Sequence, residues 1–217
     1  MKLWYRILNL LYPPRCVLCR RLLKKEETDL CTDCRMEAPF FPDTKRNLQF
    51  LDSFAAVWYY ESSVRGSLLR FKFRGARGYG ASYGKLLAMR LMQQYPEGFE
   101  VLTWIPVSRL RKLRRGYDQV ELLAKAVGRE LGMIPVSTLK KVRHNRQQSR
   151  ISESAQRRAN VLGVYRVTDP DLIRDRRVLL LDDILTTGAT ASEAGRVLLT
   201  AGAKEVHCAA VAAARKR

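Results

Sequence analysis

The pattern of hydrophobic and polar residues changes near residue 51, where a cysteine-, proline- and charge-rich region gives way to regular apolar segments. Beyond it, short runs rich in aromatic and β-branched residues predict strands, and longer stretches between them predict helices. Strands that alternate with helices are typical of βαβ units, so we expect an α/β fold with a mostly parallel sheet covered by helices. The expected strands are 54–60, 101–107, 135–139, 161–167, 177–181 and 206–213, and the expected helices are 63–73, 85–94, 118–131 and 190–201.

Two segments interrupt this alternation. Residues 75–84 are rich in glycine and predict a flexible loop. Their glycine spacing follows neither a Walker loop nor a dinucleotide-binding fingerprint, so no phosphate is assigned to them. Residues 143–160 are polar and basic without a clear period, and they predict a second loop.

The N-terminal region differs in kind from the rest. Residues 3–12 predict a short amphipathic helix that is retained, because the segment lacks a small-residue cleavage site. We expect this helix to pack on a neighbouring surface, and membrane docking is the alternative. Residues 13–42 are too few to bury a stable core unaided. The sequence therefore predicts a helix with a four-cysteine module at 1–45 and an α/β domain at 46–217.

Four of the five cysteines lie close together in the sequence. Cys16, Cys19, Cys31 and Cys34 form two C-x₂-C pairs with eleven residues between the pairs. Two such pairs can hold a tetrahedral zinc ion through four thiolates, and closing the site folds the module. We expect a closed structural zinc site, with a redox-active pair or an iron–sulfur site as alternatives. Cys208 lies in an apolar segment and is expected to be buried.

The charge of the chain restricts its partners. Forty Lys and Arg against 21 Asp and Glu give a net charge of +19, which favours nucleic acid, phosphorylated metabolites or an anionic membrane face. Residues 109–115 and 143–158 hold much of the excess, and Tyr117 is expected to be available for stacking on a base. No apolar run approaches the roughly 18–20 residues of a membrane span. Without an export signal, we expect a cytoplasmic protein.

Residues 178–190 carry the most specific chemistry. An apolar strand runs into Asp182 and Asp183, then into a Thr-Thr-Gly-Ala-Thr turn, and then into a helix. Parallel sheets bind ligands beyond the carboxyl ends of their strands, where these carboxylates should emerge. The N-terminus of the helix suits a phosphate, and Gly188 lets the backbone approach that anion. The carboxylates suit the hydroxyls of the sugar that carries the phosphate.

This segment resembles the motif that binds phosphoribosyl pyrophosphate (PRPP) in type I phosphoribosyltransferases. The resemblance implies that Asp182 and Asp183 bind the ribose 2′- and 3′-hydroxyls. It also implies that the turn binds the 5′-phosphate through Thr186, Thr187, Gly188, Ala189 and Thr190. Mg²⁺ would accompany the diphosphate. We therefore expect a type I phosphoribosyltransferase fold behind the zinc module.

A zinc module followed by such a domain resembles the ComF/GntX family of DNA-uptake-associated proteins across nearly the whole chain. The resembling segments are 11–16, 71–75, 105–109, 114–119, 147–150 and 157–160. The family commonly has Arg-Gly-Phe-Asn-Gln where this chain has Arg-Gly-Tyr-Asp-Gln. This departure leaves the role of Asp118 open.

The resemblance also assigns two loops. The loop after the second strand binds pyrophosphate in the related enzymes, which points to Val107, Ser108 and Arg109. The basic loop would close over PRPP and neutralise the leaving pyrophosphate, or else it is simply solvated. Its candidate residues are Arg146, Arg150, Arg157 and Arg158. No residue is assigned as a catalytic acid, base or nucleophile.

The implied function is PRPP binding in the DNA-uptake apparatus, with phosphoribosyl transfer to an unidentified acceptor as the implied reaction. The implied partners are PRPP, single-stranded DNA and DNA-uptake or recombination proteins. Two alternatives stay open at this point. One is a phosphoribosyltransferase of nucleotide salvage, and the other is a non-catalytic PRPP sensor that binds single-stranded DNA through its basic face.

Overall fold

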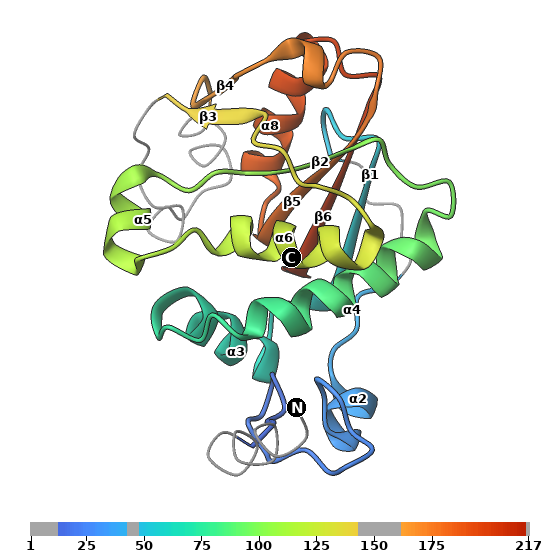
Figure 1. Ribbon diagram of the computed structural model, residues 1–217, viewed down its shortest axis with the longest axis vertical. Coiled ribbons are helices and arrows are strands. Elements are labelled where there is room, and N and C mark those ends of the chain that lie inside the picture. Colours follow the sequence, from blue (N-terminus) through green and yellow to red (C-terminus); the bar gives the residue numbers. More distant parts are fainter. Residues whose placement is uncertain (1–12, 43–47, 143–161, 216–217) are drawn as a thin grey trace, which may run out of the picture.

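The computed structural model describes residues 13–42, 48–142 and 162–215 (Figure 1). Its centre is a four-stranded sheet in the order β1-β6-β5-β2. Every neighbouring pair in this sheet is parallel, as the sequence predicts. The strands are β1 (Ser53–Tyr59), β2 (Val101–Trp104), β5 (Arg177–Leu185) and β6 (Glu205–Ala213).

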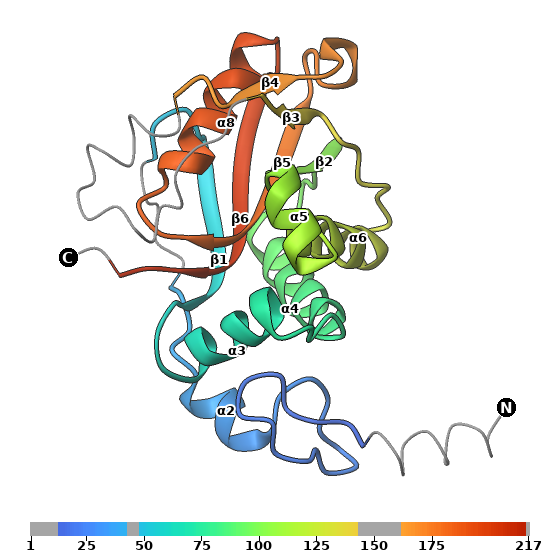
Figure 2. The same cartoon turned by 90° about the vertical axis from the view of Figure 1, so that its left-hand side faces the viewer.

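Helices cover both faces of the sheet (Figure 2). One face packs against α3 (Ser62–Phe73), α4 (Tyr79–Gln94) and α6 (Gln119–Leu131). The other face packs against α8 (Ala189–Thr200) and an antiparallel pair, β3 (Leu139–Lys141) with β4 (Tyr165–Val167). Because successive strand residues point to opposite faces, β5 contributes Leu179 and Leu181 to the first core cluster and Val178 and Leu180 to the second.

Strand β5 is longer than the sequence predicts, and this extension positions the two carboxylates. The apolar run ends at Leu181, but backbone pairing with β6 continues from Asp182 opposite Ala210 to Leu185 opposite Ala213. Strand β2 ends earlier, since Trp104 pairs with Leu181. Asp182 and Asp183 therefore lie inside β5 rather than after it, on the stretch where the neighbouring strand β2 has already ended.

The structure also corrects the prediction of a flexible loop at residues 75–84, because helix α4 already begins at Tyr79 within this segment. Gly84 lies in this helix, and a Cβ atom at Gly84 would overlap the Ala126 side chain of α6. Gly84 thus allows α4 and α6 to pack closely, and it does not belong to a flexible loop. Helix α5 (Arg109–Arg115) is absent from the sequence prediction; it begins at the cap Ser108 and ends at Gly116, whose φ is 73°.

Two predicted strands also differ from the structure. The segment before β3 makes a backbone hydrogen bond to β2, from Val136 N to Leu102 O at 2.9 Å, without forming a strand. The pair formed by β3 and β4 lies outside the main sheet. A short 3₁₀ helix, η2 (Pro170–Leu172), follows β4.

The cysteine-rich region is anchored on helix α3. It contains a bridge between Arg15 and Leu22 and the short helix α2 (Thr32–Glu37). Val17 and Leu18 are 1% exposed and belong to the same core cluster as α3 and α4. From α3, Ser67 Oγ donates to Val17 O and Arg70 Nη2 donates to Leu18 O at 2.5 Å.

The connection from this region to the sheet runs along the outer edge of β1. Phe41 N donates to Val57 O at 2.9 Å, and Tyr59 N donates to Pro39 O at 2.7 Å. Phe40 pairs with Trp58 as an antiparallel bridge. This connection therefore satisfies backbone groups on the exposed edge of the sheet.

Candidate functional site

A cavity of about 410 Å³ opens at the carboxyl ends of β1, β2 and β5. Open parallel sheets bind ligands at this end, so its position agrees with the expectation from the sequence. The lining residues come from α3, α5, α6, β5, the first turn of α8, the β3–β4 pair and the segments that follow the strands. They are Tyr60, Arg65, Leu69, Lys72, Phe73, Ile105, Pro106, Val107, Arg111, Arg115, Gln119, Val120, Lys141, Tyr165, Asp182, Asp183, Ile184, Thr186 and Thr190.

The two carboxylates point to opposite faces of β5, because neighbouring residues of a strand alternate. Asp183 lies on the face of α3 and α6 and is buried. Its Oδ1 is 2.8 Å from Lys72 Nζ, and its Oδ2 accepts a 2.7 Å hydrogen bond from Gln119 Nε2. Both oxygens of Asp183 therefore have a partner within the protein.

Asp182 lies on the face of α8 and has a different environment. Its Oδ1 accepts a hydrogen bond from Asp183 N at 2.8 Å. Burial and the neighbouring charge of Asp183 raise the pKa of the Asp182 carboxyl above its ordinary value, and Lys72 partly opposes that rise. A raised pKa means that this carboxylate lacks full compensation for its charge. It would gain from hydroxyl donors of a ligand.

The turn after β5 leads directly into helix α8. Gly188 adopts a left-handed conformation with φ of 81° at the N-cap, and Thr187 Oγ1 accepts a 3.4 Å hydrogen bond from Ala189 N. Thr186 and Thr190 line the cavity. Of the residues that the sequence assigns to PRPP, the structure thus places two threonines and both carboxylates at the cavity. The other three form the turn itself.

The predicted pyrophosphate loop follows β2. Val107 lines the cavity, and its N–H donates to Asp118 Oδ2 at 3.2 Å. Ser108 is buried and caps α5 by accepting from Arg111 N. The backbone of Arg109 begins α5, whereas its side chain is outside what the structure describes.

Asp118, whose role the sequence leaves open, connects this loop to helix α6. Its Oδ1 caps the helix by accepting from Val120 N at 2.9 Å and Glu121 N at 3.1 Å. Its other oxygen holds the Val107 N–H. Asp118 therefore fixes the position of the loop relative to α6.

Basic side chains that the sequence analysis does not assign to PRPP also surround the cavity. They are Arg65, Lys72, Arg111, Arg115 and Lys141. Burial, followed by the charge of Arg111, lowers the pKa of Lys141 to about 8, and burial likewise lowers the pKa of Arg115. Cations that are destabilised in this way favour an anionic ligand. Of the five, Lys72 and Arg115 lie in segments that the family resemblance marks, 71–75 and 114–119.

Three further expectations concern residues elsewhere. The loop residues Arg146, Arg150, Arg157 and Arg158, and the predicted helix at 3–12, lie outside the described residues. Tyr117 is not available for base stacking, because it is 7% exposed. Its hydroxyl donates to Phe71 O, and the guanidinium of Arg77 lies over its ring at 4.7 Å from the centroid.

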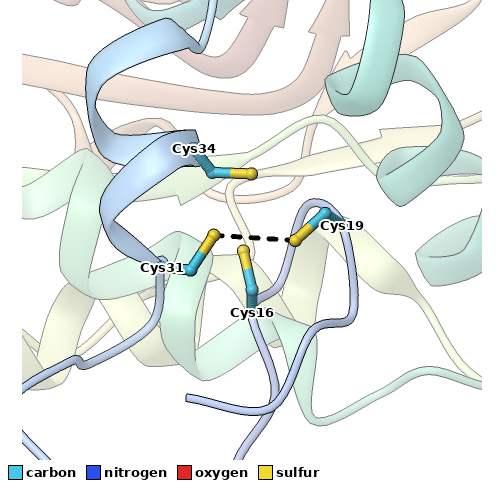
Figure 3. A group of neighbouring side chains, drawn as sticks. All are labelled: Cys16, Cys19, Cys31 and Cys34. Carbon is cyan, nitrogen blue, oxygen red and sulfur yellow. Dashed lines mark hydrogen bonds between the residues drawn. The ribbon is translucent and has the colours of Figure 1, made fainter. Parts of the chain in front are cut away.

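The four cysteines of the N-terminal region gather into one cluster. Cys16 and Cys19 lie on one loop, while Cys31 and Cys34 lie at the start of α2 and within it, and the four side chains converge (Figure 3). All four Sγ atoms lie within 4.8 Å of one another, and those of Cys19 and Cys31 are 3.6 Å apart. Tetrahedral zinc with Zn–S bonds of about 2.3 Å places sulfurs roughly 3.8 Å apart, so the cluster fits a closed structural zinc site. Cys208 is buried in the sheet, as expected.

Two family models match the chain. The phosphoribosyl transferase domain matches residues 116–217, and the double zinc ribbon domain matches residues 7–45. The first range contains both carboxylates and the turn into α8. Together with the parallel sheet and the cysteine cluster, these matches define a type I phosphoribosyltransferase fold with an N-terminal zinc-binding module.

Similar proteins cover most of the chain. Competence protein ComFC of Streptococcus pneumoniae is 30% identical over 87% of this chain and 77% of its own length. Competence protein F of Haemophilus influenzae is 26% identical over 89% of this chain and 94% of its own length. Glutamine PRPP amidotransferase from B. subtilis, a solved structure, is 20% identical with a TM-score of 0.43, covering 64% of this chain and 30% of that chain. The chain belongs to the ComF family, as its sequence motifs predict.

Proposed function

We propose that this protein binds PRPP with Mg²⁺ in the cavity and transfers the phosphoribosyl group to a nitrogen acceptor. The observation that carries the proposal is the composition of the cavity. It combines the two carboxylates, two threonines at the N-terminus of α8 and five basic side chains. A sugar with a phosphate at one end and a diphosphate at the other needs these three kinds of partner.

Each part of PRPP has a matching surface in this proposal. The 5′-phosphate binds at the turn, where Thr186, Thr190 and the backbone N–H groups at the start of α8 supply donors. The ribose hydroxyls donate to Asp182, while Lys72 and Gln119 hold Asp183 beside it. The diphosphate lies toward Arg111 and Arg115 of α5 and Lys141 of β3.

The cavity residues would stabilise the charge that develops during transfer. The bond between C1 of the ribose and the diphosphate oxygen breaks, and pyrophosphate leaves with the electron pair. The acceptor nitrogen forms the new bond to C1 and releases its proton to solvent. Arg111, Arg115 and Lys141 would stabilise the leaving pyrophosphate. Mg²⁺ bound with PRPP would neutralise part of the charge of the diphosphate.

The names of the relatives suggest the setting. They include competence proteins and the DNA utilization protein YhgH of Salmonella typhimurium, which is 27% identical over 88% of this chain. We propose that the chain acts in DNA uptake in the cytoplasm, with DNA-uptake or recombination proteins as partners. Within the described ranges, no helix is long and apolar enough to cross a membrane.

Binding of single-stranded DNA is a second proposed function, and helix α5 favours it. Lys112 and Arg114 are exposed on this helix beside the cavity, and the net charge of +19 exceeds what one PRPP requires. These side chains would contact phosphates without reading the sequence.

Isothermal titration with PRPP tests the proposed function directly. We expect PRPP to bind more tightly when Mg²⁺ is present, and we expect inorganic pyrophosphate to compete with PRPP for the site. A turnover screen with purines, pyrimidines and orotate as acceptors then tests transfer. Absence of PRPP binding at millimolar concentration, with zinc-loaded and folded protein, would overturn the proposal.

A further inference from the structure

Helix α3 holds the loop between the first two cysteines through the backbone carbonyl groups of that loop. The loop consists of Val17 and Leu18, and we call it the cysteine loop. Ser67 Oγ donates to Val17 O, and Arg70 Nη2 donates to Leu18 O at 2.5 Å. Ser67 is fully buried, so water does not replace its bond when the loop moves away. Zinc bound by the flanking cysteines would fix the shape of the loop, so both hydrogen bonds depend on a closed cysteine cluster.

The same turn of α3 reaches the cavity on its other side. Lys72 follows Arg70 by two residues, which places the two side chains on nearly opposite sides of the helix. Lys72 lines the cavity, and its Nζ is 2.8 Å from Asp183 Oδ1. Between them in sequence, Phe71 O accepts a hydrogen bond from the Tyr117 hydroxyl, in the segment that leads into α6. Helix α3 therefore connects the cysteine loop to one of the two carboxylates.

The position of α3 depends strongly on this connection. Its buried side chains Val64, Leu68 and Phe71 belong to the core, but its backbone approaches the other described helices and strands at few points. Figure 2 shows the helix between the cysteine-rich region and the sheet. A short helix moves as a unit, so a shift at the cysteine loop would also displace Lys72. Binding groups have to be held to within about 0.5 Å of their productive geometry, so such a shift is large enough to weaken a ligand.

We propose that Ser67 and Arg70 are positioning residues for the PRPP site, and that closure of the cysteine cluster raises PRPP affinity through them. The inference rests on the proposed function, because Lys72 and Asp183 belong to the PRPP site. With the cysteine loop closed, the two hydrogen bonds hold α3 where Lys72 meets Asp183. When the loop opens, Ser67 and Arg70 lose their acceptors, α3 shifts, and Asp183 is no longer held beside Asp182.

This coupling can be measured from both sites. Titration calorimetry with PRPP and Mg²⁺ compares zinc-loaded protein with protein from which zinc, and then the chelator, has been removed. We expect PRPP to bind at least about fivefold more weakly without zinc. Because coupling between two binding sites is reciprocal, saturating PRPP should raise the affinity for zinc by the same factor. Competition with a chromogenic chelator measures this second effect, with a protein-free control for zinc that PRPP itself binds.

Variants of α3 should separate the two sites while each still binds its ligand. Ser67→Ala with Arg70→Met removes both bonds to the cysteine loop and keeps all four cysteines. The zinc-loaded double variant should bind PRPP about fivefold more weakly than wild type, and zinc removal should then change its PRPP affinity by less than about twofold. Arg70→Lys keeps a cationic donor and should retain more of the coupling than Arg70→Met.

Arg90→Met is the matched control. Arg90 Nη2 donates to Phe41 O at 2.9 Å, so it also bonds a backbone carbonyl group of the N-terminal region. Its helix α4 does not line the cavity, and Arg90→Met should therefore keep the full coupling. All titrations are made at a temperature at which melting curves show the variant to be folded.

The outcomes separate this inference from the proposed function. If folded, zinc-free wild type binds PRPP as tightly as zinc-loaded protein, the inference is wrong and the proposed PRPP site stands. If zinc removal unfolds the chain, the zinc-loaded variants decide: weaker PRPP binding only in the double variant supports the inference, and equal affinity in the double variant and Arg90→Met overturns it. If zinc-loaded wild type binds no PRPP, the proposed function fails and the inference fails with it.

Discussion

The two neighbouring carboxylates should respond in opposite ways to the same substitution. Asp183→Asn removes the charge partner of Lys72, in a pair whose side chains are 18% and 5% exposed. Breaking a buried ion pair by removing one partner costs about 3–5 kcal/mol. Because the Lys72 ammonium retains some contact with water, we expect the lower end of this range or slightly below it, about 2–3 kcal/mol. For a chain of this length, that corresponds to a melting temperature lower by about 4–12 °C.

Asp182→Asn breaks no ion pair among the residues that the structure describes. Burial and the charge of Asp183 raise the pKa of Asp182 to about 8 in the folded protein. A carboxyl whose folded pKa is raised binds its proton more tightly in the folded state, so stability is lost as pH rises from about 4, the ordinary value, toward the folded pKa. We therefore expect Asp182→Asn to keep or increase the melting temperature at pH 8 and to flatten its dependence on pH.

Calorimetric unfolding at pH 5 and pH 8, together with PRPP titration, separates the two roles. Above pH 8, where Asp182 is ionised, Asp182→Asn should weaken PRPP binding by about tenfold or more, because a hydrogen bond to a charged group is worth roughly 1.5–3 kcal/mol. The control is Asp171→Asn, whose carboxylate pairs with Arg174 at the surface and is 79% exposed. If Asp183→Asn unfolds at the same temperature as Asp171→Asn, the assignment of a structural role to Asp183 is wrong.

Three further predictions concern other parts of the chain. Elemental analysis should find about one zinc ion per chain, and the Cys31→Ser variant should lose it. The melting temperature of the whole chain should also fall in this variant, because Val17 and Leu18 share a hydrophobic core with α3. In the double variant Lys112→Gln with Arg114→Gln, the slope of log DNA affinity against log salt concentration should become shallower by about 0.7 for each phosphate of single-stranded DNA that is no longer neutralised. PRPP affinity should stay unchanged. If the wild-type protein binds no single-stranded DNA at low salt, the DNA-binding proposal is wrong. Gly84→Ala should lower stability by about 1–3 kcal/mol in calorimetry because its methyl group would overlap Ala126, whereas Gly78→Ala, whose methyl group meets no described atom within 4 Å, should not.

Most of the fold follows from local patterns in the sequence. The strands of the main sheet and three of its helices are predicted because their apolar periodicity agrees with their final environment. The C-x₂-C spacing likewise predicts the cysteine cluster, since four thiolates are needed to close a small module. These signals are local, and the tertiary structure reinforces them.

Other features depend on partners that are distant in sequence. Strand β5 continues through two carboxylates because β6 continues beside it, which no local pattern reveals. Gly84 has the sequence context of a loop residue, and its role in packing emerges only when Ala126 of α6 is placed against it. Lys72 and Gln119 become site residues only when α3 and α6 bring them to Asp183. The sequence therefore identifies the carboxylates, and the structure distinguishes their environments.

The segment at 39–41 has a consequence for any attempt to study the sheet without the cysteine-rich region. Its hydrogen bonds to Val57 and Tyr59 cover the outer edge of β1. A truncation that begins at residue 46 would remove this cover and leave an open, apolar strand edge, which is a template for intermolecular strand pairing. Such a fragment should self-associate even when its own core is intact, whereas a fragment that begins at Pro39 would keep the edge covered. The boundary that preserves solubility therefore lies several residues before the boundary that composition suggests.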